Sequence, residues 1–318
     1  MAPHLPFAGF CCRGKESPLV CAAHVSRRNF LMGTAAGALG MAVSSCSTVD
    51  LTAQEAGGDL LSRIRDRGEV NIGIANEAPY GFVDRAGRIT GEAPELARIV
   101  FQRLGVERMN PRITDFGALI PALQVGVFDV IAAGMFVTPA RCEQILFSDP
   151  EYQAPESLMV PKGNPKGIRT LDDIVARKDI RVGLLTGSAN ISYATDLGLM
   201  DRAVIFDSVF SGLDGILANR ADAFSLTAIS LRDALSKRPD APLELTPTYV
   251  PVIGGKRKLG CGAFGFRRDQ RIFRDAFNVE LNLMRANGEL LSTVRPFGFT
   301  ESEMTTLTAT ELCTDTSS

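Results

Sequence analysis

Strand-like and helix-like segments alternate along most of the chain, and this alternation limits the fold more than any other feature. Residues 70–74 have the period of a strand, and residues 94–104 carry the apolar stripe of a helix that Gly105 ends. The alternation continues through 128–133, 171–176, 181–185, 203–206, 212–218 and 223–225 to a long amphipathic helix at 270–286. This pattern predicts an α/β protein, and 318 residues suffice for two lobes.

Histidine is nearly absent, which excludes several kinds of chemistry. The two histidines, His4 and His24, both lie in a segment that we interpret below as a removable signal. Without them, Ser-His-Asp and Cys-His catalysis and histidine-bound metals are excluded, so we expect no metal and no cofactor. The net charge of −2 also argues against a nucleic-acid surface, which needs a basic footprint.

Residues 1–46 have the features of an export signal, and residues 47–59 those of a polar tether. Ser26 to Leu31 reads SRRNFL, a twin-arginine motif, and a short apolar run to Val43 follows it. The run ends at VSSC, which resembles a bacterial lipobox and predicts lipidation of Cys46; ordinary signal cleavage nearby is the alternative. No later segment is apolar enough to span a bilayer.

Three further cysteines follow Cys46, namely Cys142, Cys261 and Cys313. Export permits a disulfide, and three cysteines allow three pairings among which the sequence does not decide. We favour Cys142–Cys313, because it would hold the C-terminal tail and leave Cys261 free.

Four segments carry a resemblance to a known family. They read GEAPELA at 91–97, LIPALQVG at 119–126, DVIAAGMFVTPAR at 129–141 and FSDP at 147–150. Together they resemble the polar-amino-acid-type extracytoplasmic solute-binding proteins of ABC importers, over residues 60–312. Within that family, the segments at 76–80, 115–118 and 134–142 are similar to those of members that bind ectoine or hydroxyectoine.

The resemblance implies a two-lobed periplasmic-binding-protein fold of type II, with α/β lobes joined by two crossover strands near 158–160 and 260–266. Lobe 1 would comprise 60–158 and 262–318, the latter including the C-terminal tail, and lobe 2 would comprise 159–261. A ligand would lie in the cleft, and hinge closure over it is the expected motion.

Arg141 is the expected partner of a ligand carboxylate. It follows Thr138 and Pro139, which mark a helix start. The matching arginine of the family pairs with the ligand carboxylate, for which a planar guanidinium is well suited. A surface arginine is the other interpretation, but a cation at a helix N-terminus opposes the helix dipole, and this favours a binding role.

An aromatic cage is expected opposite this arginine. Phe136 stands where amino-acid binders of the family usually have a small hydroxyl residue, and the resemblance matches it, with Tyr80 and Phe116, to three cage walls. Ring faces attract a delocalised cation. Each ring alone would more often be a core residue, but the match of all three favours the cage. Glu77 would accept ligand N–H groups unless it is a solvated loop acid, and Gly134 belongs to the same cleft segment.

The second lobe offers weaker signals. Amino-acid binders of the family usually carry an acid for the ligand ammonium five residues after an aspartate, and here Asp222 is followed by Thr227. Asp222 itself is expected to be structural. Gly187 opens a helix whose free N–H groups favour a carboxylate, and Ser188 and Asn190 either contact the ligand or cap the helix.

These residues predict a protein that captures a small zwitterion, ectoine or hydroxyectoine, and passes it unchanged to ABC permease subunits. An ordinary amino acid and a betaine are the alternatives within the same class. Thr227 and Phe136 disfavour the former, and the latter has no N–H group for Glu77. A cyclohexadienyl-dehydratase-like enzyme, with Glu77 as general acid, is a less favoured alternative. We expect a monomer in the periplasm or at the outer face of the cytoplasmic membrane.

Overall fold

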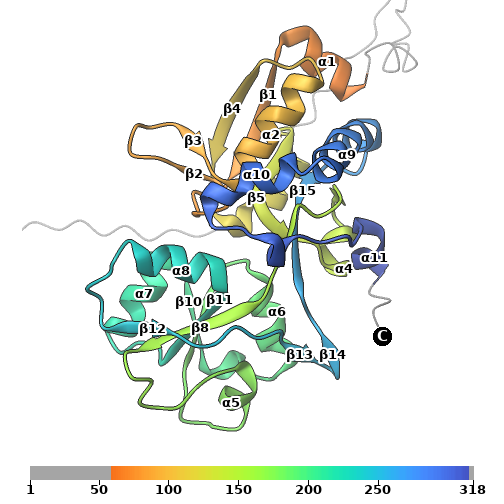
Figure 1. Cartoon of the computed structure of the whole chain (residues 1–318). Coiled ribbons are helices and arrows are strands. Elements are labelled where there is room, and N and C mark those ends of the chain that lie inside the picture. The colour runs from red at the N-terminus through yellow and green to blue at the C-terminus, as the bar shows by residue number, and fades with distance from the viewer. Residues whose placement is uncertain (1–58, 315–318) are drawn as a thin grey trace, which may run out of the picture. The chain divides into compact units, whose positions relative to one another are not determined.

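Two β-sheets organise residues 59–314, the part of the chain that the computed structural model describes. These residues belong to one compact unit, 51–318. Each sheet is accompanied by its own helices, so that each forms a separate lobe (Figure 1).

The sheet of the first lobe has the strand order β4-β1-β5-β15-β6, and β7 also pairs with β15. Its first three strands along the chain are parallel, whereas β15 runs antiparallel to β5, β6 and β7. The strands are β1 (Glu69–Ile74), β4 (Arg108–Ile113), β5 (Val130–Phe136), β6 (Leu146–Phe147), β7 (Tyr152–Ala154) and β15 (Gly260–Phe266). A separate hairpin is formed by β2 (Phe82–Val83) and β3 (Ile89–Thr90).

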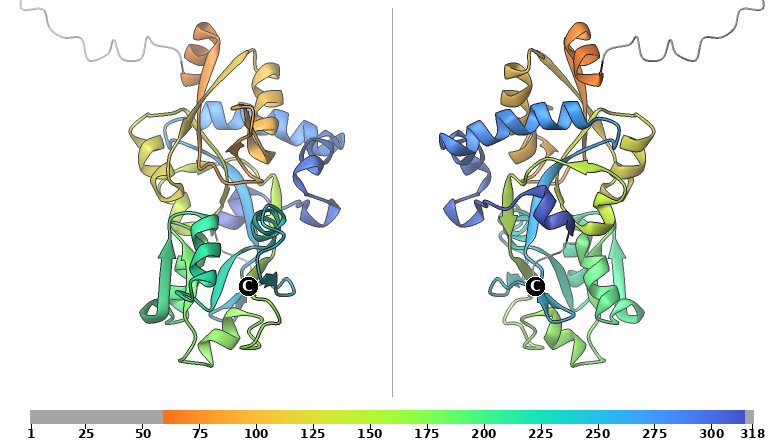
Figure 2. Two further views of the ribbon diagram at one scale, coloured as in Figure 1. Left: turned by 90° about the vertical axis from the view of Figure 1, so that its left-hand side faces the viewer. Right: turned by 90° about the vertical axis from the view of Figure 1, so that its right-hand side faces the viewer.

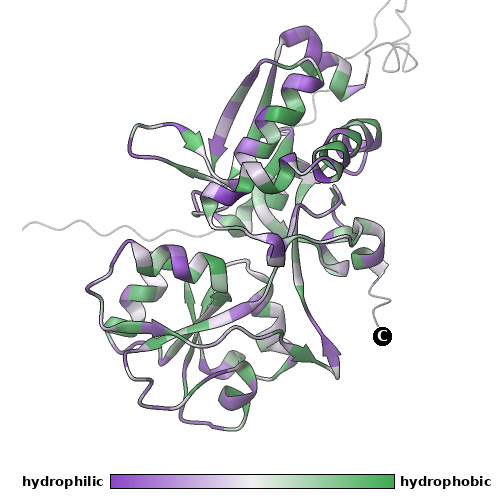
Figure 3. Cartoon of the chain, viewed as in Figure 1, coloured by the Kyte–Doolittle hydropathy of each residue, from purple (hydrophilic) through white to green (hydrophobic). Residues whose placement is uncertain are grey.

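The helices of this lobe, apart from the four-residue α4, bury apolar residues. They are α1 (Leu60–Arg67), α2 (Glu92–Arg103), α3 (Leu119–Gln124), α4 (Pro139–Cys142), α9 (Arg271–Ala286), α10 (Glu289–Val294) and α11 (Ala309–Thr314). Phe273, Phe277, Leu281 and Met284 of α9 are buried, as the amphipathic pattern predicts. Figure 2 shows α9 in blue beside the strands of the first sheet, and Figure 3 shows polar and apolar residues on the same helices.

The sheet of the second lobe has the strand order β10-β9-β11-β8-β12. Its strands are β8 (Glu156–Pro161), β9 (Val182–Leu185), β10 (Ala203–Phe206), β11 (Ala223–Thr227) and β12 (Leu243–Leu245). The three central strands in this order, β9, β11 and β8, are almost entirely buried, and most of their residues are apolar, as expected for strands covered on both faces. The helices are α5 (Leu171–Val175), α6 (Ala189–Asp196), α7 (Val209–Leu217) and α8 (Ala228–Ser236), and β13 (Val252–Ile253) pairs with β14 (Lys256–Arg257).

The chain passes between the sheets twice. It leaves the first sheet after β7 and enters the second at β8, with Pro155 between them, and it returns between β14 and β15. The expected two-lobed α/β fold with two connections is therefore confirmed. The expected lobe limits fall inside β8 and β15, whereas strand pairing puts the changes of sheet at 155 and at 258–259, because each strand pairs as a whole.

A disulfide joins the C-terminal helix to the first lobe. Cys142 of α4 is bonded to Cys313 of α11, so the favoured pairing is confirmed. Cys261 is buried and forms no disulfide with another cysteine of the described residues. Within residues 59–314, no helix has the length and apolar character needed to cross a membrane. The same residues contain no group of three or more His, Cys, Asp or Glu side chains arranged to hold a metal ion.

Candidate functional site

One cavity, with about 370 Å³ of empty space including its opening to solvent, is lined by the predicted site residues of both lobes. It is lined by nine residues that were predicted from the sequence: Glu77, Tyr80, Phe116, Gly134, Phe136, Arg141, Ser188, Asn190 and Thr227. Ala133, Leu185, Ala189 and Leu226 complete the lining. Because the parallel strands of each sheet end at the same edge, the loops and helix starts that follow them meet here.

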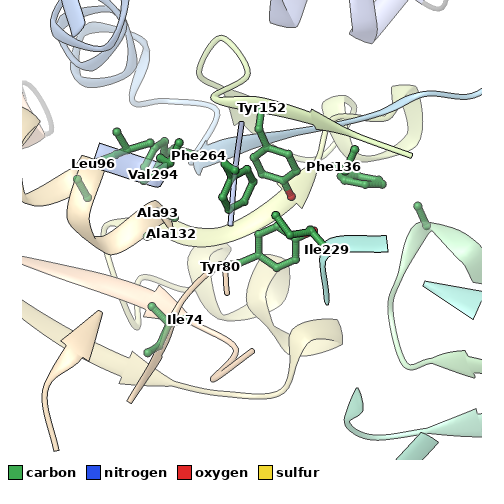
Figure 4. Close-up of a cluster of buried hydrophobic side chains, with 14 of the residues drawn as sticks. Ile74, Tyr80, Ala93, Leu96, Ala132, Phe136, Tyr152, Ile229, Phe264 and Val294 are labelled. Atoms are coloured by element: carbon green, nitrogen blue, oxygen red, sulfur yellow. The ribbon is translucent and has the colours of Figure 1, made fainter. Parts of the chain in front are cut away.

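Tyr80 is held in place by a second tyrosine and by a glycine. Its ring stacks on Tyr152 with centroids 5.2 Å apart, and the Tyr152 hydroxyl donates to the carbonyl oxygen of Gly134 at 2.9 Å. Gly134 has a positive φ of 60°, and a Cβ there would lie 2.5 Å from the Tyr80 ring. Position 134 therefore requires glycine, and Figure 4 shows the two tyrosine rings together.

Phe136, the last residue of β5, is packed against β15. A Cβ on Gly260 would lie 1.9 Å from its ring, so the glycine makes room for the phenyl group. Phe136 is 7% exposed, and its ring centroid lies 6.4 Å from that of Tyr152 (Figure 4). The ring thus belongs to the core and also lines the cavity, so the two interpretations of this residue do not exclude each other.

Arg141 presents a cation to the cavity, and no carboxylate of residues 59–314 pairs with it. Thr138 caps α4 and accepts a hydrogen bond from the Arg141 backbone N–H, as the sequence predicts for a helix start. The guanidinium donates to the carbonyl oxygens of Phe136 (2.7 Å) and Gly187 (2.9 Å) and lies 5.6 Å from the Phe116 ring centroid.

This guanidinium is therefore available to an anion. Within residues 59–314 it forms no ion pair. Burial lowers the pKa of Arg141 to about 10, so the group remains charged at neutral pH. A carboxylate is the natural partner of a guanidinium in such a position.

Glu77 supplies the acid of the cavity. It follows β1, and its Oε1 accepts a hydrogen bond from the hydroxyl of Ser230 in the other lobe. Burial raises the pKa of Glu77 to about 7; the Ser230 hydrogen bond opposes this rise, and the nearby Asp233 charge adds to it. A positively charged ligand group would favour the ionised form.

The second lobe contributes three polar residues to the cavity. Ser188 occupies the N-cap position of α6 but makes no capping hydrogen bond, and its hydroxyl has no partner among the described residues. The amide Nδ2 of Asn190 donates to Glu156 Oε2 at 3.0 Å and to Ser225 Oγ at 2.9 Å. Thr227 shares a hydrogen bond with the Tyr80 hydroxyl at 2.8 Å. Simple helix capping therefore accounts for neither Ser188 nor Asn190.

Asp222 has a structural role, as expected. Its carboxylate pairs with Lys166 and Arg181, both at 3.1 Å, and accepts a hydrogen bond from the Arg181 backbone N–H. It does not line the cavity.

Three residues around the site were not identified from the sequence. Tyr152 stacks on Tyr80. Its place two residues after the FSDP segment, which belongs to the family pattern, could have identified it. Glu156 is a 1%-exposed acid at the start of an apolar strand, which is itself unusual. Ser230 gives no signal, because a serine on the buried side of a helix is common and its partner Glu77 is 153 residues away.

Comparisons with known proteins identify the family. A model of the bacterial extracellular solute-binding proteins, family 3, matches residues 70–299. The chain belongs to this family. Its expected family and its type II periplasmic-binding-protein fold are thereby confirmed.

Three relatives illustrate the range of this family. The probable amino-acid ABC transporter periplasmic-binding protein of Sinorhizobium fredii is 32% identical over 281 residues, covering 86% of this chain and 92% of the relative. EhuB, whose crystal structure was determined in complex with hydroxyectoine, is 34% identical in sequence, with a TM-score of 0.73. The match covers 80% of this chain and 97% of EhuB. The structure of an ancestral arginine-binding protein bound to arginine is 27% identical in sequence, with a TM-score of 0.64. The match covers 73% of this chain and 99% of the ancestral protein.

The family 3 protein is thus the solute-binding component of an amino-acid-type ABC importer. This role implies a small ligand and permease subunits as partners, and its homologues include periplasmic proteins. The expected twin-arginine signal, the lipidation at Cys46 and residues 47–58 of the tether lie outside the described residues. Asp59, expected as the last tether residue, caps α1 by accepting a hydrogen bond from the Ser62 backbone N–H.

Proposed function

We propose that this solute-binding protein captures ectoine or hydroxyectoine and delivers it unchanged to the permease of its importer. One observation carries the proposal: the guanidinium of Arg141, which has no acidic partner in residues 59–314, faces the same cavity as Glu77 and the rings of Tyr80, Phe116 and Phe136. A compact zwitterion whose positive charge is delocalised over an N–H-bearing ring matches this set of groups.

In this proposal, each part of the ligand has a partner. The ligand carboxylate pairs with Arg141 and lies near the start of α6, where the Ser188 hydroxyl has no partner among residues 59–314. The cationic ring lies among the aromatic faces, and its N–H groups donate to Glu77. Each cation–π contact contributes about 0.5–2 kcal/mol, so these contacts and two charged hydrogen bonds are compatible with roughly micromolar binding. Hydroxyectoine binding by EhuB supports the same ligand class.

An ordinary amino acid is the second candidate, because the Sinorhizobium relative and the ancestral protein are named for amino-acid transport or arginine binding. Such a ligand needs an anion for its α-ammonium group. The acid expected for this task is replaced by Thr227, whose hydroxyl is already bonded to Tyr80. Glu156 is close to that position but is enclosed and bonded to Asn190, so Glu77 would have to take over the role.

We further propose that the protein is not an enzyme. A dehydratase needs a positioned general acid, and Glu77, with its raised pKa, is the one acid that lines the cavity in the described part of the chain. Its hydrogen bond to Ser230 favours the ionised form of Glu77, which has no proton to donate. Monomeric state, export by the twin-arginine motif and anchoring through Cys46 complete the proposal.

The test is a titration-calorimetry panel of the purified protein with ectoine, hydroxyectoine, arginine, glutamine and glycine betaine. We expect micromolar or tighter binding of ectoine, hydroxyectoine or both, and weak or no binding of the other three. Tight binding of arginine or glutamine with no response to either ectoine would refute the proposed ligand. Conversion of prephenate or arogenate by the same sample would refute the non-catalytic role.

A further inference from the structure

Two pairs of side chains connect the lobes at the edge of the ligand cavity. Glu77 and Tyr80 lie three positions apart after β1, and Thr227 and Ser230 lie three positions apart where β11 meets α8. The Ser230 hydroxyl donates to Glu77 Oε1, and the Thr227 hydroxyl shares a 2.8 Å hydrogen bond with the Tyr80 hydroxyl. Glu77 and Tyr80, two of the cavity-lining side chains of the first lobe, are therefore each held by a hydroxyl of the second lobe.

Both contacts are enclosed. Ser230 is 0% exposed, and Thr227 and Tyr80 are about 5% exposed. A hydrogen bond to a charged group in such surroundings stabilises by more than one on the surface, because water does not replace it. The bond occupies Oε1 of Glu77, while Oε2 forms no hydrogen bond with residues 59–314 and is left for a ligand N–H.

The electrostatic surroundings give Ser230 a specific role. A neighbouring cavity of about 510 Å³ shares Glu77 and is lined by Asp115, Asp207 and Asp233, with no Lys or Arg from the described residues in its lining. Asp233 of α8 is paired with Lys237 but still raises the pKa of Glu77. Tyr80, on the same loop as Glu77, is neutral, since burial keeps its pKa well above the usual value. Of these surrounding groups, the Ser230 hydroxyl is the one that favours the ionised carboxylate.

We infer that Ser230 and Thr227 are positioning residues, whose hydroxyls hold Glu77 and Tyr80 in their binding orientation and connect the two lobes around the ligand. The identity of the ligand rests on the proposed function, but the positioning role does not. Thr227 occupies the position where amino-acid binders of the family usually carry their ammonium-binding acid. In this chain it affects the ligand indirectly, by orienting Tyr80.

The decisive variants are Ser230→Ala and Thr227→Val, which remove one hydroxyl each with little change of shape. Ser236→Ala, on the exposed end of the same helix, is the matched control. In the ligand-bound protein, whose lobes are expected to be closed, carbon-13 NMR of the Glu77 carboxyl group, assigned with Glu77→Gln, gives the pH at which this group titrates. We expect a higher midpoint in Ser230→Ala and an unchanged midpoint in Ser236→Ala.

Titration calorimetry with ectoine, and with arginine as a second probe, supplies the other measurement. We expect the dissociation constant to rise roughly tenfold or more in Ser230→Ala and severalfold in Thr227→Val, with melting temperatures close to wild type. An unchanged Glu77 midpoint in Ser230→Ala would overturn the inference, whichever probe binds. Binding of arginine instead of ectoine would refute the proposed ligand only, because the variants would then be measured with arginine.

Discussion

Asn190 and Glu156 are joined by a hydrogen bond inside the second lobe, with 3.0 Å between Nδ2 and Oε2. A second bond from Nδ2 to Ser225 uses the other amide hydrogen, so the oxygen of the Asn190 amide is directed away from both partners. The ionised form of Glu156 can only accept hydrogen bonds, so in that form the Asn190 amide is turned with Nδ2 toward the carboxylate. We therefore expect the Asn190 amide oxygen to serve as an acceptor for a ligand.

We predict that Glu156→Gln weakens ligand binding severalfold without lowering stability. Glutamine can accept or donate, so Asn190 is no longer held in one orientation. Burial raises the pKa of Glu156 to about 7, because the ionised carboxylate is costly to enclose. At pH 8, replacing it by a neutral amide should therefore leave the melting temperature unchanged or raise it. Calorimetric titration and differential scanning calorimetry measure the two effects. Wild-type affinity in this variant would contradict the assigned orientation.

Two substitutions of Arg141 distinguish the contribution of its positive charge to ligand binding from that of its planar guanidinium shape. We expect Arg141→Ala to weaken binding about 100-fold or more, and Arg141→Lys to recover only part of this loss, because an ammonium group cannot form the two parallel hydrogen bonds of a guanidinium. The exposed Arg112 provides the control variant, Arg112→Ala. If Arg141→Ala retained near-wild-type affinity by titration calorimetry, the role of Arg141 as carboxylate partner would be wrong.

Phe136→Thr restores the small hydroxyl residue found at this position in amino-acid binders. We expect affinity for ectoine to fall at least tenfold and affinity for arginine or glutamine to rise. The ring fills the space above Gly260, so its loss also costs about 3 kcal/mol or more of stability. Phe136→Leu keeps most of that volume without the aromatic face, and it distinguishes lost packing from lost cation–π contact. Unchanged ectoine affinity in Phe136→Leu would contradict the cage.

The residues of this site that could be predicted from the sequence lie within short continuous segments. Arg141, Phe136 and Gly134 belong to one segment with a recognisable pattern, and the edge of a parallel sheet brings such segments together. Contacts between segments are different. The Glu77–Ser230 and Asn190–Glu156 hydrogen bonds join residues 153 and 34 positions apart, and neither spacing leaves a periodic signal. The expected lobe limits, taken from the family resemblance, fall inside β8 and β15, because a resemblance in sequence does not show at which residue strand pairing changes.

Stability should fall as the pH rises. Burial raises the pKa of Glu77 and Glu156 to about 7 and that of Glu151 to about 8, against an ordinary value of 4.5. Between these values the folded protein binds more protons than the unfolded chain, so raising the pH through this range favours unfolding. We expect the melting temperature without ligand to drop by about 5 °C or more between about pH 5 and pH 8.

Differential scanning calorimetry at constant ionic strength measures this drop. Glu77→Gln should reduce the slope, because it removes one of the groups with a raised pKa, whereas Glu107→Gln, an exposed glutamate, should not. A melting temperature that increases over the same range would show that the three carboxyl groups titrate normally in the folded protein.

The Cys142–Cys313 disulfide connects the C-terminal helix to the residue that follows Arg141. Helix α4 has only four residues, so its position depends on its contacts with α11 and on this bond. We expect the double variant Cys142→Ser/Cys313→Ser to lose about 2–4 kcal/mol of stability and to bind ligand severalfold more weakly, because the guanidinium is less firmly oriented. Urea unfolding and titration calorimetry at 15 °C, where the variant remains folded, measure both quantities. Lower stability with unchanged affinity would mean that the backbone carbonyls of Phe136 and Gly187 suffice to orient Arg141.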